Sequence, residues 1–518
     1  MFIQIVFFVL SLTLTLLFSL YGFNHYYLLN AGRRYNPSTL VNSENDRPSV
    51  SIHLPVYNEK YVVRRLVVAC TRMAEVYGMD RVNILILDDS DDDTVMEIDK
   101  VADEYSKKHF HIEVVRRGNR QGFKAGALQI ALDQTPEEYI AIFDADFTPS
   151  EDFLVRTLPH FLQDEHLGII QSRWCHLNRD YNFLTKTVAI GIDIHFIIEQ
   201  TGRHAAGLFQ NFNGSGGVLR KRAILEAGGW QADTLSEDLD LSYRIQLLGY
   251  TVLYLKDLKS PGEIPPTIPS FKKQQGRWAC GSLRTARKIL PQLLRKHDLG
   301  FKKRLQAFIH LTGYMIQPLM SISFLLTCVA TFLGLNISRA SQSYILFPAS
   351  GILGTTRAIT LFSLQNATWM FLGPLIGLCT IAPWVSSIST LRFEKLPLSQ
   401  NIISLVLLLL LGLGISISNT LEAGKALFSN RIWEFSRTPK YAYLENKGGW
   451  RASKYQIALD SVWILELLFA CLGAVAITIT IAFRRSDFSV LLILIPFTIA
   501  YAFICFLTVL QSKRQTVS

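Results

Sequence analysis

From residue 45 onward, short apolar runs alternate with longer amphipathic segments. The apolar runs have the length of buried strands, and the segments between them carry apolar residues at helical spacing. They predict strands at 49–54, 83–87, 111–115 and 139–143, and helices ending near Tyr77 and at 93–108 and 124–133. Alternating strands and helices predict a mostly parallel, doubly wound sheet with helices on both faces.

The pattern continues less regularly toward residue 300. We expect a short strand at 168–172, a helix at 183–200, a glycine-rich loop at 212–217 and an amphipathic helix ending at Leu248. The loop lacks the spacing and the Lys of a phosphate-binding loop. Its small residues would instead let the backbone approach a bulky ligand. Residues 45–300 are therefore expected to form one α/β domain.

The chain from residue 305 onward is largely apolar. Segments at about 311–336, 366–390, 461–482 and 488–510 approach the ~20 residues that a membrane-spanning helix needs. The Lys and Arg residues of 421–457 place that segment in the cytoplasm. If 45–300 is also cytoplasmic, an even number of crossings lies between residues 305 and 421. We expect 401–419 to be re-entrant or interfacial; the alternative is that 343–362 also crosses.

Residues 2–20 are apolar as well, with no positive charge before them and with Arg33 and Arg34 after them. This charge order predicts a membrane anchor with its N-terminus outside, because a signal peptide carries its charge first. The expected organisation is an anchor at 1–24, the α/β domain at 45–300, membrane and interfacial helices at 305–420, a cytoplasmic loop at 421–457 and two spans at 458–512. We thus expect a multi-pass membrane protein, in the plasma membrane if the source is prokaryotic.

The net charge of +10 follows from Lys and Arg that gather beside the apolar segments. In 270–304 they are interleaved with Leu283, Ile289, Leu290, Leu293 and Leu294, which is typical of an amphipathic helix at a membrane surface. A solvated charged face is the alternative. We read the basicity as topology and lipid contact, and expect no nucleic-acid partner. The seven cysteines are scattered, which predicts neither a disulfide framework nor a zinc site.

Polar side chains follow three of the predicted strands where each strand ends, at Pro55–Glu59, Asp88–Asp91 and Asp144–Asp146. In an open α/β sheet, ligands bind beyond the carboxyl ends of the strands. Two carboxylates spaced by one residue, with no His or Cys nearby, suit a hard cation such as Mg²⁺ or Mn²⁺, which completes its shell with substrate phosphates. The alternative is an acidic turn, since Asp is common in turns.

Three further features could serve a substrate that carries a diphosphate. Lys124 opens a predicted helix, where anions are favoured, or it is a solvated surface lysine. Asp238 either caps its helix or acts as a general base. Arg277 can pair with phosphate, and Trp278 offers a flat apolar face to a sugar ring, although Trp is also common at membrane interfaces.

Taken together, the ordered series Asp88-Asp89, Asp144-x-Asp146, Glu237-Asp238 and Gln274-x-x-Arg277-Trp278 resembles the D, DxD, [T/E]ED and QxxRW pattern of processive family 2 glycosyltransferases. These are membrane-embedded synthases typified by cellulose synthase. The residues around the motifs are closer still to the plant cellulose-synthase-like mannan and glucan synthases. The resemblance covers residues 45–300 closely and the apolar half loosely.

The resemblance implies a GT-A-like α/β domain joined to a transmembrane helix bundle. It implies that Tyr57, Glu59 and Asp88 hold a nucleoside, that Lys124 contacts the diphosphate, and that Asp144 and Asp146 bind the nucleotide and Mg²⁺ or Mn²⁺. Asp238 would be the general base. The remaining implied substrate-binding residues are Asn213, Gly214, Glu237, Gln274, Arg277 and Trp278.

Residues 435–440 are similar to the FxVTxK gating loop of cellulose synthases, with Phe435, Thr438 and Lys440 at the matching positions. Arg437 stands where that pattern has Val, and Pro439 occupies its variable position. The similarity implies that this segment is cytoplasmic and that it gates the substrate site.

The resemblance implies an inverting transferase that moves a sugar from UDP-glucose or GDP-mannose to a growing β-glycan and passes the polymer through its own spans. One alternative is a glycolipid synthase that adds one or a few sugars to a membrane lipid. Another, from a different class, is a transporter with a cytosolic binding domain, although the predicted spans hold few charged residues, unlike those of most transporters. The residues leave the donor sugar, the linkage and any accessory subunit open.

Overall fold

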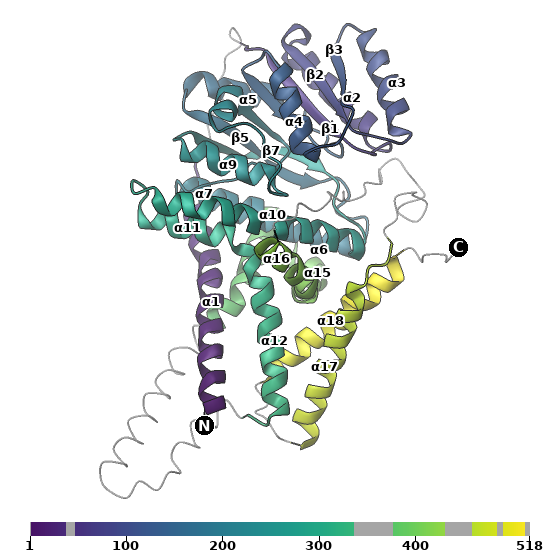
Figure 1. Ribbon diagram of the computed structural model, residues 1–518. Coiled ribbons are helices and arrows are strands. Elements are labelled where there is room, and N and C mark those ends of the chain that lie inside the picture. Colours follow the sequence, from purple (N-terminus) through teal and green to yellow (C-terminus); the bar gives the residue numbers. More distant parts are fainter. Residues whose placement is uncertain (1, 38–46, 336–376, 430–457, 484–489, 513–518) are drawn as a thin grey trace, which may run out of the picture. The chain divides into compact units, whose positions relative to one another are not determined.

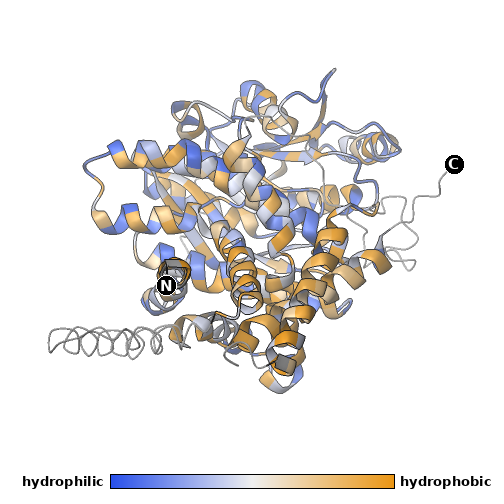
Figure 2. Cartoon of the chain, turned by 60° about the horizontal axis from the view of Figure 1, so that its bottom comes forward, coloured by the Kyte–Doolittle hydropathy of each residue, from blue (hydrophilic) through white to orange (hydrophobic). Residues whose placement is uncertain are grey.

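The computed structural model describes residues 2–37, 47–335, 377–429, 458–483 and 490–512. The chain divides into two compact units. One, the sheet unit, comprises Leu28–Thr312 and Gly424–Ile457, and the other, the helical unit, comprises Met1–Tyr27, Gly313–Ala423 and Ala458–Ser518. Figure 2 shows that helices of the helical unit are mostly hydrophobic along their length, whereas those of the sheet unit alternate between hydrophobic and hydrophilic positions.

The sheet unit is built on one seven-stranded sheet in the order β3-β2-β1-β4-β6-β5-β7 (Figure 1). The strands are β1 (Val50–Val56), β2 (Val82–Asp88), β3 (His111–Arg116), β4 (Tyr139–Ile142), β5 (Leu167–His176), β6 (Gly217–Arg220) and β7 (Thr251–Gly262). All neighbouring pairs are parallel except those of β6, which runs antiparallel to β4 and β5. The predicted mostly parallel sheet is confirmed.

Helices cover both faces of this sheet, because the strands bury alternate side chains on opposite sides. On β2, Ile84 and Ile86 join one core cluster with residues of α2 (Val63–Tyr77), α3 (Thr94–Ser106) and α5 (Phe153–Gln163). Leu85 and Leu87 join a second cluster with residues of α4 (Phe123–Gln134), α8 (Lys221–Glu226) and α9 (Glu237–Leu247). The predicted helices on both faces are confirmed.

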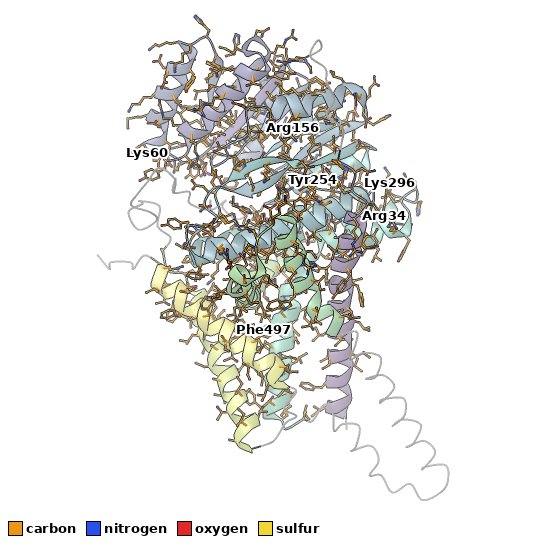
Figure 3. The ribbon with its side chains drawn as sticks, turned by 180° about the vertical axis from the view of Figure 1, so that it is seen from behind. Arg34, Lys60, Arg156, Tyr254, Lys296 and Phe497 are labelled. Carbon is orange, nitrogen blue, oxygen red and sulfur yellow. The ribbon has the colours of Figure 1, made fainter. Side chains whose placement is uncertain are left out.

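The predicted helix at 183–200 is longer than expected and changes its winding midway. α6 (Phe183–Ile194) continues through a π-helical turn, His195–Gln200, into α7 (Thr201–Ala205). Tyr254 of β7 donates a hydrogen bond to the carbonyl of Phe196 in that turn at 2.8 Å (Figure 3). The π-helical turn is therefore fixed to the sheet.

The basic segment 270–304 differs from its prediction. It forms α10 (Ile268–Arg295) and the start of α11 (Phe301–Leu311). The apolar face that was expected to meet lipid is largely used inside the protein, because Leu283, Ile289 and Leu293 are buried. Only Leu294 of the predicted apolar face is strongly exposed, at 67%.

The helical unit contains α1 (Phe2–Gly32, extending past the unit boundary), α12 (Ile316–Phe332), α15 (Leu398–Gly414), α16 (Ser416–Phe428), α17 (Val462–Phe483) and α18 (Leu491–Gln511). Residues 377–393 are also helical. Phe324, Tyr501 and Phe497 (Figure 3) pack together in its core.

Within the described residues, three helical segments are long and apolar enough to cross a membrane, namely Gly313–Phe332, Val462–Ala482 and Leu491–Gln511. α15 and α16 meet at a bend of 43° and would count as a fourth span if they cross together. They include the predicted re-entrant or interfacial segment 401–419. α1 includes the predicted anchor but is not among the three, so its insertion stays a prediction. The expected segments 343–362 and most of 421–457 lie outside the described residues.

Candidate active site

One pocket opens at the carboxyl ends of β1, β2 and β4, bounded by the first turns of α4 and α9 and by α10. Within the described part of the chain, it collects all the site residues expected from the sequence except Asp88. These are Tyr57, Glu59, Lys124, Asp144, Asp146, Asn213, Gly214, Glu237, Asp238, Gln274, Arg277 and Trp278. The gating residues Phe435, Thr438 and Lys440 lie outside the described residues.

Lys124 links three parts of this pocket. It lies in the first turn of α4, and its Nζ donates to Asp144 Oδ1 at 2.5 Å and to the carbonyl oxygen of Gly214 at 2.8 Å. Burial lowers the pKa of Lys124, but the neighbouring carboxylates outweigh it and leave this pKa raised. Lys124 therefore stays positively charged. Its two hydrogen bonds and its side-chain exposure of 17% do not fit a solvated surface lysine.

Asp238 lies at the start of α9 against the glycine loop. A Cβ built on Gly214 would lie 2.8 Å from Asp238 Oδ2, and Gly214 has a φ of +81°. Burial and, to a smaller extent, the charge of Glu237 raise the pKa of Asp238, whereas Lys124 lowers it, and the net result is a pKa of about 7. A carboxyl group with a pKa near neutrality is suited to proton transfer. Its Oδ1 also accepts from the N–H of Leu239 at 2.8 Å, so it retains a local role in the helix start.

Asp146 is held from two sides at the end of β4. Its Oδ2 accepts from the backbone N–H of Glu263 at 2.9 Å, and its carbonyl accepts from Arg65 at 3.3 Å. Arg65 also donates to Glu263 Oε1 at 2.9 Å, and the Glu263 side chain is only 1% exposed. A buried ion pair thus fixes the loop that carries the second carboxylate.

The two aspartates fit a metal that is shared with a ligand. Asp144 and Asp146 line the same pocket, and oxygen donors of this kind suit Mg²⁺ or Mn²⁺. In the described part of the chain, no group of three or more His, Cys, Asp or Glu residues could hold a metal. Mg²⁺ usually completes its coordination with waters and substrate phosphates, which could join Asp144 and Asp146 here.

Arg277 is a second cation in the pocket. Burial lowers its pKa, although the carboxylates of Glu237, Asp144, Asp238 and Glu59 counteract this effect. The helix that carries it approaches the start of α9 closely, since a Cβ built on Gly281 would collide with Ser236. The glycine at 281 thus lets α10 bring Arg277 and Trp278 beside Asp238.

At the edge near β2, Asp88 is not among the residues that line the pocket, and its expected role in holding a nucleoside stays a prediction. Its side chain is buried, accepting from the Nε of Arg116 at 2.8 Å and from the N–H of Ser90 at 3.0 Å. Asp89 lines the pocket instead and forms a pair with Arg117 at 2.5 Å. Asp89 directly follows the last residue of β2 and lines the pocket together with Leu87 of that strand.

Sequence reasoning missed several pocket residues. Arg120 places its guanidinium carbon 3.3 Å from the centroid of the Tyr57 ring, a cation–π arrangement. Trp174 and His176 also line the pocket from β5. His176 Nε2 lies 3.0 Å from Asp193 Oδ1. An aromatic or basic residue near the end of a strand was the only signal that could have indicated them.

Comparison with known proteins agrees with this geometry. Residues 139–382 match the family described as "Glycosyl transferase family group 2". The chain is 32% identical over 322 residues to probable glucomannan 4-beta-mannosyltransferase 4 of Oryza sativa subsp. japonica, covering 61% of this chain and 57% of that protein. It is 35% identical over 288 residues to glucomannan 4-beta-mannosyltransferase 2 of Arabidopsis thaliana, covering 54% and 53%.

The chain thus spans about half the length of the curated relatives it matches, at 57% and 53%. Among solved structures, mannosyltransferase PcManGT from Pyrobaculum calidifontis, in complex with GDP-Man and Mn2+, is 19% identical with a TM-score of 0.48, covering 72% of this chain and 98% of that chain. A likeness this distant supports no conclusion about function. The family match and the sheet agree with the predicted GT-A-like fold. Over residues 139–382 this chain is similar to the family group 2 glycosyl transferases, and over a longer stretch it is similar to plant glucomannan 4-beta-mannosyltransferases.

Proposed function

We propose that the protein is a membrane-embedded, inverting glycosyltransferase that moves a hexose from a nucleotide sugar to a growing β-glycan. The observation that carries the proposal is the single pocket that contains Asp144, Asp146, Asp238, Arg277 and Trp278. The relatives are named glucomannan 4-beta-mannosyltransferases, which favours mannose as the transferred sugar and a 4-β linkage in the product. The donor is then GDP-mannose, with UDP-glucose as the other candidate.

The chemistry is a displacement at the anomeric carbon of the donor. The acceptor hydroxyl oxygen forms the new bond to that carbon while the bond to the diphosphate oxygen breaks, and Asp238 takes the hydroxyl proton. Attack opposite the leaving group turns an α-linked donor into a β-glycoside. The raised pKa of Asp238 supports this role, since a general base works best when its pKa lies near the working pH.

The departing diphosphate is negatively charged, and the pocket supplies cations for it. Lys124 and Arg277 both line the pocket and can pair with phosphate oxygens. Asp144 and Asp146 would hold Mg²⁺ or Mn²⁺, which would act as a Lewis acid on the diphosphate. Lys124, now bonded to Asp144, would exchange part of that contact for phosphate when the donor binds.

The two ends of the pocket suit the two substrates. Tyr57, Glu59, Asp89 and Arg120 lie at the end formed by β1, β2 and the start of α4, where a nucleoside can stack on an aromatic ring. Gln274 and Trp278 lie on α10, and the flat face of Trp278 suits the acceptor sugar. Asn213, Gly214 and Glu237 line the same pocket and would border the donor sugar.

The membrane assignment is part of the proposal. We propose that 1–24 is an anchor, that 305–420 and 458–512 supply further spans, and that 45–300 and 421–457 are cytoplasmic. The three long apolar segments support spanning by their length and composition. The product would leave through these spans, gated by the segment that contains Phe435, Thr438 and Lys440.

Purified protein assayed with a panel of radiolabelled nucleotide sugars tests the function. The proposal expects transfer from GDP-mannose or UDP-glucose into a long polymer with β-linkages. A labelled product that extracts into organic solvent would instead identify a glycolipid synthase. If the protein is folded in a bilayer and transfers sugar from none of the donors, the glycosyltransferase proposal is contradicted. The remaining hypothesis is then a transporter with a cytosolic binding domain.

The pH dependence of transfer reports on Asp238. Because its pKa is raised to about 7 by burial and by Glu237, the reactive carboxylate is lost as the pH falls through that value. We expect kcat/KM to show an acidic limb near pH 7, compared with about 4 for an ordinary aspartate, and expect Glu237→Gln to move it to lower pH. An acidic limb that stays in place in this variant would argue against the assignment.

Arg65 should matter more than its neighbour Arg64. Arg65→Gln leaves the buried Glu263 carboxylate without its pair, which costs about 3 kcal/mol in the free energy of unfolding. Arg64 pairs with Glu104 on the surface, where such a pair contributes about 0–1 kcal/mol. Chemical denaturation in detergent micelles measures both changes. Equal losses in Arg65→Gln and Arg64→Gln would show that the buried pair does not hold the loop of Asp146.

A further inference from the structure

The helix α11 uses only part of its surface to pack against the protein. Ala307 and Leu311 are buried in a cluster with Ile289 and Leu293 of α10. This contact fixes α11 alongside the end of α10 (Figure 1). It also determines which side of α11 remains uncovered.

The uncovered side of α11 is apolar. Phe301 is 77% exposed, Phe308 is 41% exposed, and Leu305 between them is partly exposed. Their spacing of four and three residues places them on one face of the helix. Leu294 adds an exposed side chain at the end of α10. Exposed apolar side chains that gather in this way mark an interaction surface.

Basic side chains accompany these apolar residues. Arg295, Lys302 and Lys303 are exposed, and Asp298 is the exposed carboxylate between them. Lys296, which marks this corner in Figure 3, donates to the carbonyl of Leu247 and is thus partly committed within the protein. A surface that is both apolar and cationic complements an anionic lipid leaflet, which attracts nearby Lys and Arg side chains.

The position of α11 in the chain supports the same partner. The candidate span Gly313–Phe332 begins directly after Thr312, and α11 ends at Leu311. If that segment crosses a bilayer, the C-terminal end of α11 lies at the membrane surface. At 1.5 Å per residue, the helix extends about 17 Å from there to Phe301, so its whole length can lie in the plane of the interface.

We propose that α11 and the end of α10 form a membrane-docking surface for anionic lipid. Leu294, Phe301, Leu305 and Phe308 enter the boundary between headgroups and acyl chains. Arg295, Lys302 and Lys303 bind the anionic headgroups. Lipid contact is thereby assigned to residues 294–308 in place of the long amphipathic face of α10, which is used inside the protein.

This surface also concerns the reaction. α10 is one helix of 28 residues whose N-terminal half carries Gln274, Arg277 and Trp278. Docking at its C-terminal end would hold this helix, and with it the proposed acceptor-binding residues, at a fixed height above the leaflet. This consequence rests on the proposed function, whereas the lipid contact itself does not.

A tryptophan probe tests the contact directly in the full-length chain. We would reconstitute Phe301→Trp in nanodiscs with ordinary or brominated phospholipids, and subtract the fluorescence of the parent protein with its eight tryptophans. The proposal expects bromine to quench about half or more of the added emission. Met96→Trp is the matched control, because Met96 is 58% exposed on α3, far from α11 in the sheet unit (Figure 1).

A second set of quenching measurements tests whether the lipid partner is anionic. Quenching of Phe301→Trp should increase when phosphatidylglycerol replaces part of the phosphatidylcholine, and Lys302→Glu/Lys303→Glu should remove that increase. Equal quenching in neutral and anionic discs would overturn the anionic partner. If bromine does not quench the emission of Phe301→Trp, lipid docking is overturned. If the emission of this variant in detergent instead shifts to the blue as the protein concentration rises, the surface binds another copy of the chain and not lipid. None of these readouts depends on sugar transfer, so they fail or succeed separately from the proposed function.

Discussion

Replacing Asp238 by Asn should reduce the rate of sugar transfer by about 10²–10⁴-fold, the usual contribution of a general base. The amide keeps the size of the side chain and its contact with the N–H of Leu239, but it cannot accept the proton of the acceptor hydroxyl. The loss should therefore appear in kcat at saturating donor, measured as radiolabel incorporated into product. Nucleotide release without an acceptor should fall as well, because water needs the same base.

Binding separates loss of chemistry from loss of structure in this variant. Asp238→Asn should bind nucleoside diphosphate within a few-fold of the parent protein, since its side chain is not expected to contact the nucleoside. Asp233→Asn is the matched control, because Asp233 is exposed in the segment just before α9, pairs with Lys288 and does not line the pocket. Normal kcat in Asp238→Asn would remove Asp238 from the reaction.

The general position of the site could be predicted from the sequence because of a simple geometric rule. Parallel strands place their carboxyl ends at one edge, so polar residues after β1, β2 and β4 had to meet there. The strand register supports this. The last residue of β1, Val56, pairs with the last residue of β2, Asp88, and β4 ends at Ile142 opposite His53 of β1. Residues more than 200 positions apart in the chain, such as Tyr57 and Trp278, were linked only by the family resemblance.

The choice between Asp88 and Asp89 could not be made from composition. The two residues are identical and adjacent, and only the pleat decides which one faces α4. Asp89 lies on the same side as Leu85 and Leu87, which pack in the cluster of α4, and that is the side of the pocket. The family motif locates this pair of aspartates in the sequence, but only the structure shows which of the two lines the pocket.

The far end of the sheet was also hard to predict. β7 has an apolar run only in its first half, at Val252–Leu255. Its second half contains Lys256, Asp257, Lys259 and Pro261, so no apolar pattern marks the full strand. It nevertheless pairs with β5 along most of its length, with shifts of register on the way. β6 has four residues and directly follows the glycine loop, so its antiparallel direction depends on contacts that no local pattern records.

The segment 270–304 shows why an amphipathic pattern does not identify its partner. Alternating apolar and basic residues suit lipid or a protein core equally well, because both bury the apolar face. Here Ile289 and Leu293 pack with Leu239 and Tyr243 of α9, and even Lys272 and Arg284 are buried. Tertiary packing therefore decides that α10 completes the active-site domain.

Removing divalent cations with EDTA should abolish transfer, and Mn²⁺ or Mg²⁺ should restore it. The diphosphate leaves with its negative charge, and the loss of one preorganised electrostatic contact of this kind typically costs about 10²–10³-fold in rate. Asp146→Asn should raise the cation concentration for half-maximal activity, because Asp146 lines the pocket and is held in place by the N–H of Glu263.

Cation binding itself provides the test that does not depend on turnover. Titration of Mn²⁺, followed by electron paramagnetic resonance with nucleoside diphosphate present, should show at least about tenfold weaker binding in Asp146→Asn than in the parent. Asp152→Asn, an exposed carboxylate at the start of α5 that pairs with Arg156, should leave the titration unchanged. Full activity in EDTA would mean that pocket cations such as Lys124 and Arg277 stabilise the leaving group without a metal. Unchanged Mn²⁺ binding in Asp146→Asn would remove Asp146 from the metal site.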